Sequence, residues 1–193
     1  MRILAAALLF LASPANARAE FFAIPFMGMK FGGGTSIFDI EFAADDTKFT
    51  FGGAAMQMDQ GILGFEGSFG YVPGYYESDN TLLTTGSFMI DLAGSVILSL
   101  PPQVTAGGLR PYGAIGAGLV HVQAADKLRL FQVRRTVPAA NLGIGAIGLL
   151  TNNVGVRFDY RYVRSLTTDD GSLSSVGRRI SFSRFAVGLL LRL

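Results

Sequence analysis

Val154-Gly-Val-Arg-Phe-Asp-Tyr-Arg-Tyr162 alternates, one residue at a time, between an apolar or aromatic side chain and a glycine or a charged one. Successive side chains of an extended strand point to opposite faces, so Arg157, Asp159 and Arg161 share one face and the aromatic rings share the other. This period of two predicts a β-strand whose two faces meet different surroundings.

The same alternation recurs along the whole chain. It is clear in the third, fourth, seventh and eighth segments, whereas Gly and Met blur it in the others. With the turn residues between the segments, it predicts an all-β protein with eight antiparallel strands, at residues 21–33, 47–58, 61–73, 84–100, 110–122, 139–150, 154–166 and 180–193.

The first 19 residues are typical of a cleavable signal peptide. Arg2 supplies the positive charge, residues 3–12 form the apolar core, and Ala17-Arg-Ala19 is a small-residue cleavage motif. The apolar run is shorter than the roughly 20 residues that a transmembrane helix needs. Residues 20–193 are then one barrel domain with 14 basic and 14 acidic residues, a balance that argues against nucleic-acid binding.

Alternation alone does not decide which face is inside. A soluble lipocalin-like barrel packs its apolar face inward, whereas an outer-membrane barrel turns that face to lipid. Here the less apolar face is mostly Gly, Ala and Ser with a few charges of both signs, and the chain has only three lysines, Lys30, Lys48 and Lys127. Soluble surfaces carry more charge, so the pattern favours a transmembrane β-barrel.

The connections between the expected strands fall into two groups. Those at 34–46, 74–83, 123–138 and 167–179 are long and polar, and they alternate with the shorter connections 59–60, 101–109 and 151–153. Outer-membrane barrels keep both termini and the short turns in the periplasm, with the long loops outside, and this layout matches. The connection at 101–109 is longer than is usual for such a turn.

The long connections carry opposite charges. The first is acidic, with Asp39, Glu41, Asp45 and Asp46, and the third is basic, with Lys127, Arg129, Arg134 and Arg135. They are either ordinary solvated loops or surfaces that contact the phosphates of lipopolysaccharide. No spacing matches an EF-hand or a Cys/His site, so we expect no metal and no cofactor.

The whole region after the leader resembles the small outer-membrane β-barrel family that includes the OmpA transmembrane domain, OmpX and OmpW. The segment 154–162 carries the resemblance together with the terminal Phe185-Ala-Val-Gly-Leu-Leu-Leu-Arg-Leu193. In that family the terminal segment is the assembly signal read by the barrel-insertion machinery. The resemblance therefore implies this role for Gly188, Leu191 and Leu193. The chain departs from the family in ending with Leu rather than Phe and in having no Trp.

Charged residues on the inward face form the candidate site. If the register is right, the lumen holds Glu66, Asp91, Arg157, Asp159, Arg161, Arg184 and Arg192, while Phe158, Tyr160, Phe185, Val187 and Leu189 face lipid. Buried charges of both signs have to pair, so these residues predict an ionic network. Eight strands enclose a lumen just wide enough for side chains to fill, which favours a structural network over a charged pore constriction.

Two further motifs suggest chemistry but have simpler explanations. Gly143-Ile-Gly-Ala-Ile-Gly148 matches a dinucleotide fingerprint, yet another strand follows it rather than the helix that the motif requires. His121 is the only histidine, and Gln123 rather than a serine shares its face. A nucleophile on a neighbouring strand stays open, but a polar residue at the membrane rim is the favoured interpretation.

These observations predict a non-enzymatic protein of the outer membrane of a Gram-negative-type cell, exported through its signal peptide. It would stabilise the envelope or present its loops for surface contact. We expect a monomer whose partners are outer-membrane lipids, lipopolysaccharide and, during insertion, the barrel-assembly machinery. A narrow, porin-like channel for small and even hydrophobic solutes is the alternative, as resemblance to OmpW implies, and a lipid A-modifying enzyme comes third.

The leader assignment is testable directly. Cleavage after Ala19 leaves Glu20 as the first residue, so intact mass and N-terminal sequencing of protein from outer-membrane fractions are expected to show a chain beginning there. Recovery from the soluble periplasmic fraction would instead support the lipocalin-like barrel.

Overall fold

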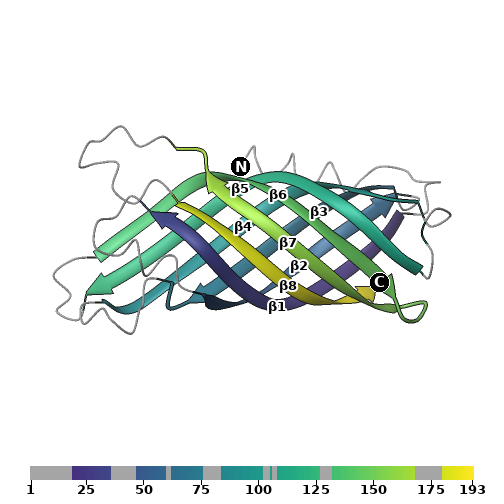
Figure 1. Ribbon diagram of the computed structural model, residues 1–193, viewed down its shortest axis with the longest axis horizontal. Coiled ribbons are helices and arrows are strands. Elements are labelled where there is room, and N and C mark those ends of the chain that lie inside the picture. Colours follow the sequence, from purple (N-terminus) through teal and green to yellow (C-terminus); the bar gives the residue numbers. More distant parts are fainter. Residues whose placement is uncertain are drawn as a thin grey trace, which may run out of the picture.

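The computed structural model describes residues 19–35, 47–59, 62–75, 84–101, 105, 108–126, 132–167 and 180–193. They form a closed antiparallel barrel in which each strand pairs with its neighbours in the chain (Figure 1). The strands are β1 (Ala19–Thr35), β2 (Lys48–Asp59), β3 (Leu63–Pro73), β4 (Thr84–Ser99), β5 (Leu109–Asp126), β6 (Gln132–Leu149), β7 (Val154–Ser165) and β8 (Ile180–Arg192). The predicted fold class is confirmed.

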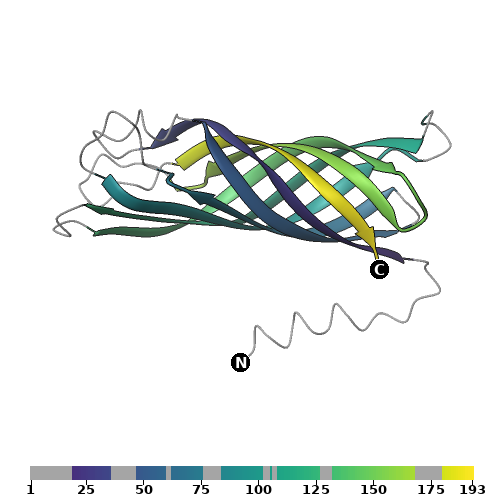
Figure 2. The same ribbon diagram turned by 90° about the horizontal axis from the view of Figure 1, so that it is seen from below.

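The barrel closes where the first and last strands meet. β1 pairs with β8 from Phe22–Arg192 to Thr35–Ile180, so the beginning of the barrel and its end lie side by side (Figure 2). This seam supplies the first and last strands with partners and leaves no open sheet edge along the wall, which lipid would not tolerate. Among the described residues no helix is long and apolar enough to cross a membrane.

Strand boundaries differ from the prediction mainly in β5 and β6. The connection predicted at 123–138 is largely strand, since the β5–β6 ladder runs on to the pair Ala125–Gln132. Its polar and charged side chains suggested a loop. Pro138 is tolerated in the strand because it lies one residue beyond the β6–β7 ladder, which ends at Ala139–Ser165, so no partner strand needs its missing N–H.

Burial follows the predicted alternation. Along β3 and β7 exposed and buried residues alternate almost without a break, and β4 and β8 follow the same pattern over most of their length. The residues predicted to contact lipid lie on the outer face, with Tyr160 and Val187 38% exposed and Phe158, Phe185 and Leu189 44–45% exposed. The barrel is therefore apolar outside, the reverse of a lipocalin-like arrangement.

Leu189 tests the lipid face. Leu189→Arg places a charge in hydrocarbon and is expected to lower the free energy of unfolding by about 2–4 kcal/mol if the site lies near the bilayer midplane. The control is Leu150→Arg at the β6–β7 turn, where a charge at the membrane edge costs about 0–1 kcal/mol. Urea unfolding in lipid vesicles, followed by circular dichroism, measures both, and equal losses would contradict this placement.

Candidate functional site: the charged layer in the lumen

The lumen is filled in three layers. At the end that holds the termini, apolar side chains form one buried cluster, comprising Phe22, Ile24, Met56, Met58, Ile97, Tyr112, Ala114, Ile147 and Leu190. At the opposite end they form a second, comprising Val72, Tyr75, Met89, Val120, Val122, Val137, Ala139, Val163, Ile180 and Phe182. Between the two lie the buried, ion-paired side chains of β3, β4, β7 and β8, which we call the charged layer: Glu66, Asp91, Arg157, Asp159, Arg161 and Arg184.

Two arginines and two carboxylates form the larger part of the charged layer. Arg157 contacts Glu66 through Nη1 and lies 2.8 Å from Asp159 through Nη2. Arg161 lies 2.5 Å from the second oxygen of Glu66 and 2.9 Å from Asp159. Each carboxylate therefore bridges both guanidinium groups, and the four side chains, no more than about a tenth exposed, carry no net charge.

A second ion pair completes the charged layer. Arg184 Nη1 lies 2.9 and 3.0 Å from the two carboxylate oxygens of Asp91. Its guanidinium group also lies 5.0 Å from the ring centre of Phe26, within the range of a cation–π contact. Gly70 makes this pair possible, because a Cβ at that position would lie 2.0 Å from Asp91 Oδ2 and 2.4 Å from Arg184 Nη1.

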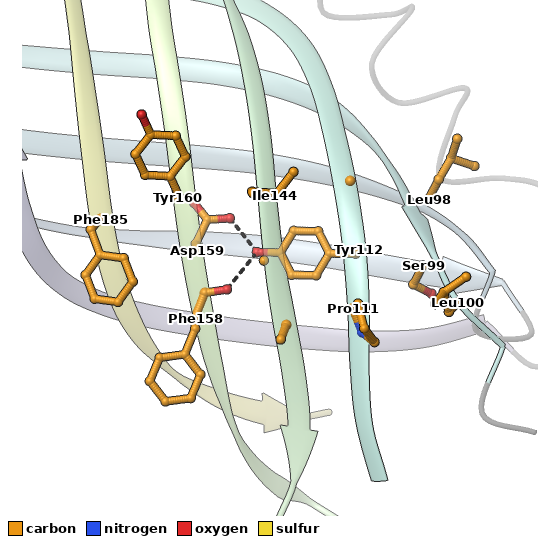
Figure 3. A pocket seen from close by; sticks show the side chains of 13 residues that line it. Leu98, Ser99, Leu100, Pro111, Tyr112, Ile144, Phe158, Asp159, Tyr160 and Phe185 are labelled. Atoms are coloured by element: carbon orange, nitrogen blue, oxygen red, sulfur yellow. Dashed lines mark hydrogen bonds between the residues drawn. The ribbon is translucent and has the colours of Figure 1, made fainter. Parts of the chain in front are cut away.

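Tyr112 of the adjacent apolar cluster contacts the charged layer, a role that sequence reasoning missed. Its hydroxyl donates to Asp159 and lies 3.4 Å from the carbonyl oxygen of Phe158 (Figure 3). It also accepts a 2.7 Å hydrogen bond from Arg157 Nε. Its ring also lies against Arg157, 4.9 Å from the guanidinium carbon. The signal was a tyrosine at an alternate position from Arg110 and Ala114, on the inward face of a strand whose alternation Gly obscures.

Arg192 is not part of the charged layer. It lies 2.7 Å from Glu20, and the two side chains are 37% and 28% exposed. Alternation along β8 was right, but Arg192 is the last residue of that strand and lies beyond the terminal apolar cluster. It joins the end of β8 to the beginning of β1 instead.

Lys30 is a buried charge that the sequence reasoning did not place inside. It is fully buried, and its ammonium group lies 4.8 Å from the ring centre of Tyr75. Tyr75 reaches this position through Gly74, whose positive φ of 62° turns the chain at the end of β3. The ring of Tyr75 also packs edge-on against Phe182, so aromatic groups close the lumen beside Lys30.

The space left around the charged layer is small. Two voids, each of about 10 Å³, lie against Arg161 and Arg184. Such a void holds at most about one water molecule. On the outer wall, by contrast, an open apolar hollow of about 680 Å³ lies between Leu98, Ile144, Phe158 and Phe185 (Figure 3).

The weaker motifs take structural positions. Gly143–Gly148 lies wholly inside β6, where a Cβ on Gly145 would lie 2.3 Å from both Tyr112 and the backbone of Phe158. His121 faces outward, and its Nδ1 lies 2.8 Å from Thr136 Oγ1. Arg134 and Arg135, expected in a loop, are exposed residues of β6.

The remaining candidates are placed only in part. The acidic residues between 36 and 46, Lys127 and Arg129, and the leader up to residue 18 lie outside the described residues. In the terminal segment Gly188 is buried, Leu191 is partly buried and Leu193 is 84% exposed, and its part in assembly stays a prediction. Within the described ranges no three His, Cys, Asp or Glu side chains gather as a metal site would require.

Solved structures share this architecture. Neisserial surface protein A (NspA) is 13% identical, with a TM-score of 0.62 over 91% of this chain and 99% of that one. Ail, the attachment invasion locus protein of Yersinia pestis, solved with a heparin analogue, is 12% identical, with a TM-score of 0.56 over 91% and 98%. The N-terminal barrel of Pseudomonas aeruginosa OprF is 18% identical, with a TM-score of 0.51 over 89% and 97%.

At these identities the likeness shows the fold alone. No curated protein matches the chain significantly. The model of the outer membrane protein beta-barrel domain family, however, matches residues 3–192, nearly the whole sequence. Eight closed strands, an apolar outer wall and this match agree, and the chain belongs to the outer membrane protein beta-barrel domain family, whose members are outer-membrane proteins.

Proposed function

We propose that the protein is a non-enzymatic structural barrel of the outer membrane with a closed lumen. It would stabilise the envelope and present its connections at the cell surface. The observation that carries this proposal is the filled interior, in which a charged layer with three ion-paired arginines lies between two buried apolar clusters.

The packing of the lumen best supports a structural barrel that does not conduct ions. A conducting pore needs a continuous wet path, whereas buried and mutually paired side chains fill the charged layer, and two voids beside it are about 10 Å³ each. The apolar clusters on both sides add dry constrictions, which oppose ion passage because water and ions leave such regions. The narrow channel is therefore the less favoured candidate.

The charged layer serves closure rather than catalysis in this proposal. Arg157 and Arg161 are each held by two carboxylates, and Arg184 is held by both oxygens of Asp91, so these side chains are fixed in place rather than offered to a substrate. Since β3, β4, β7 and β8 supply the partners, the ion pairs tie opposite walls of the barrel together.

Electrical recording tests closure. Detergent-folded protein added to planar bilayers is expected to give no steady single-channel steps, because charged and apolar side chains fill the lumen. Asp159→Ala is expected to stay silent as well, since the apolar clusters remain. Regular conductance steps from the unmodified protein would overturn the closed lumen and favour the narrow channel.

Unfolding experiments test the charged layer. Asp159→Ala removes one of the two carboxylates that pair with Arg157 and Arg161, and stranding a buried charge typically costs about 3–5 kcal/mol. The control Glu20→Ala breaks the exposed pair with Arg192, which is expected to cost about 0–1 kcal/mol. Urea titration of the detergent-folded barrels measures both, and equal stability would show that the interior charges are solvated.

A further inference from the structure

Four polar side chains gather on the outer wall at the end away from the termini. His121 and Gln123 alternate along β5 with the buried Val120 and Val122, so they point outward. Their directly paired residues on β6 are Thr136 and Arg134, both exposed. We call these four residues the polar quartet; they form a two-by-two square on one face of the β5–β6 ladder.

The polar quartet is held in place by contacts within the wall. Thr136 Oγ1 lies 2.8 Å from His121 Nδ1, which fixes the imidazole plane. The other side of the ring faces Phe88 of β4, with ring centres 6.2 Å apart. Arg134 therefore projects beside an oriented histidine and two neutral hydrogen-bonding groups, an arrangement suited to the oxygens of an anion.

An apolar hollow begins directly below the polar quartet. Leu119 precedes His121 by two residues on the same face, a distance of about 7 Å along a strand. From Leu119 the hollow runs across β4, β3 and β2 to Ala23 of β1, with a volume of about 750 Å³. Phe69 and Leu92 form its rim and Gly67 and Gly94 its floor. Four strand spacings amount to about 19 Å, a length that suits an extended acyl chain.

The glycines of this floor differ from those that face the lumen. A Cβ on Gly67 or Gly94 would meet no atom within 4 Å, whereas one on Gly70 would overlap the Asp91–Arg184 pair. Packing within the barrel therefore explains Gly70 but leaves Gly67 and Gly94 without a role. Their effect is to keep the outer wall hollow in the middle of an otherwise bulky apolar surface.

We propose that the polar quartet and this hollow together bind one phosphate-bearing acyl lipid of the outer leaflet. Arg134 and His121 hold the phosphate, Gln123 and Thr136 donate hydrogen bonds to it, and one acyl chain lies across Gly94 and Gly67. Charge complementarity selects the occupant, because the side chains of the polar quartet are cationic or neutral and the path below them is apolar. The inference rests on the membrane-embedded wall of the proposed structural barrel and not on its closed lumen, so conductance does not bear on it.

Native mass spectrometry of the detergent-folded barrel tests the site with three probes: dimyristoyl phosphatidate, dimyristoyl phosphatidylcholine and inorganic phosphate. We expect one phosphatidate to bind about ten-fold more tightly than phosphatidylcholine, as charge-assisted hydrogen bonds would give. The preference should weaken as ionic strength rises. Inorganic phosphate should bind far more weakly than either lipid.

Matched variants separate the two halves of the site. Arg134→Gln should remove the preference for phosphatidate, while Arg135→Gln, one residue away on the other face, should keep it. Gly94→Leu fills the hollow and should weaken both lipids about ten-fold. Gly113→Leu is its control, since Gly113 also faces open space but lies in a different hollow. Gly94→Ala provides a milder form if the leucine variant fails to fold.

Several outcomes would overturn the proposal. One is equal affinity for phosphatidate and phosphatidylcholine, and another is an equal effect of Gly94→Leu and Gly113→Leu. Phosphate binding that matches phosphatidate and ignores Gly94→Leu would indicate a site for free phosphate only. A dimer that Gly94→Leu disperses would assign the hollow to a second copy of the chain.

Discussion

The structure depends on one constraint, that backbone N–H and C=O groups inside a membrane need partners within the protein. The seam between β1 and β8 meets it by pairing residues that lie far apart in the chain, from Phe22–Arg192 to Thr35–Ile180. Pro25 has no N–H to donate. It lies in a short interruption of the β1–β8 ladder, between the pairs Ala23–Leu191 and Phe26–Gly188, where no such donor is needed. The chain has no cysteine, so closure of the sheet rather than disulfides holds its ends together.

Closing the sheet creates a second demand, since a ring of eight strands encloses space that has to be filled. The protein fills this space with buried apolar clusters at both ends and with a layer of ion pairs between them. Three acidic and three basic groups of the ion pairs balance there, which limits the cost of removing them from water. The inward glycines follow from the same demand, because long arginine side chains need room against the opposite wall.

Strand number, strand order and facing were predictable because they depend on period-two patterns that read directly from residues such as 154–162. The six inward charges that pair were predictable for the same reason. Individual partners were not, because whether Arg157 meets Glu66 or Asp91 depends on strand tilt and stagger, which no local pattern encodes. Tyr112 was missed because glycine-rich β5 hides its alternation. Arg192 was wrongly assigned to the ionic network because alternation along a strand predicts which face a side chain is on, but not how close the residue lies to the end of the barrel.

The length of β6 has a consequence for the cell surface. Beyond Ala139 this strand keeps its partner β5 on one side, while the β7 ladder on the other side ends at Ser165. Among the described residues, 132–137 have no ladder partner on that side, and an extended segment of another protein can add to a strand edge of this kind. Pro138 lacks a donor there, and the adjacent charges of Arg134 and Arg135 repel a second copy of themselves. A missing backbone donor and adjacent like charges both oppose the edge-to-edge pairing of two copies of this strand.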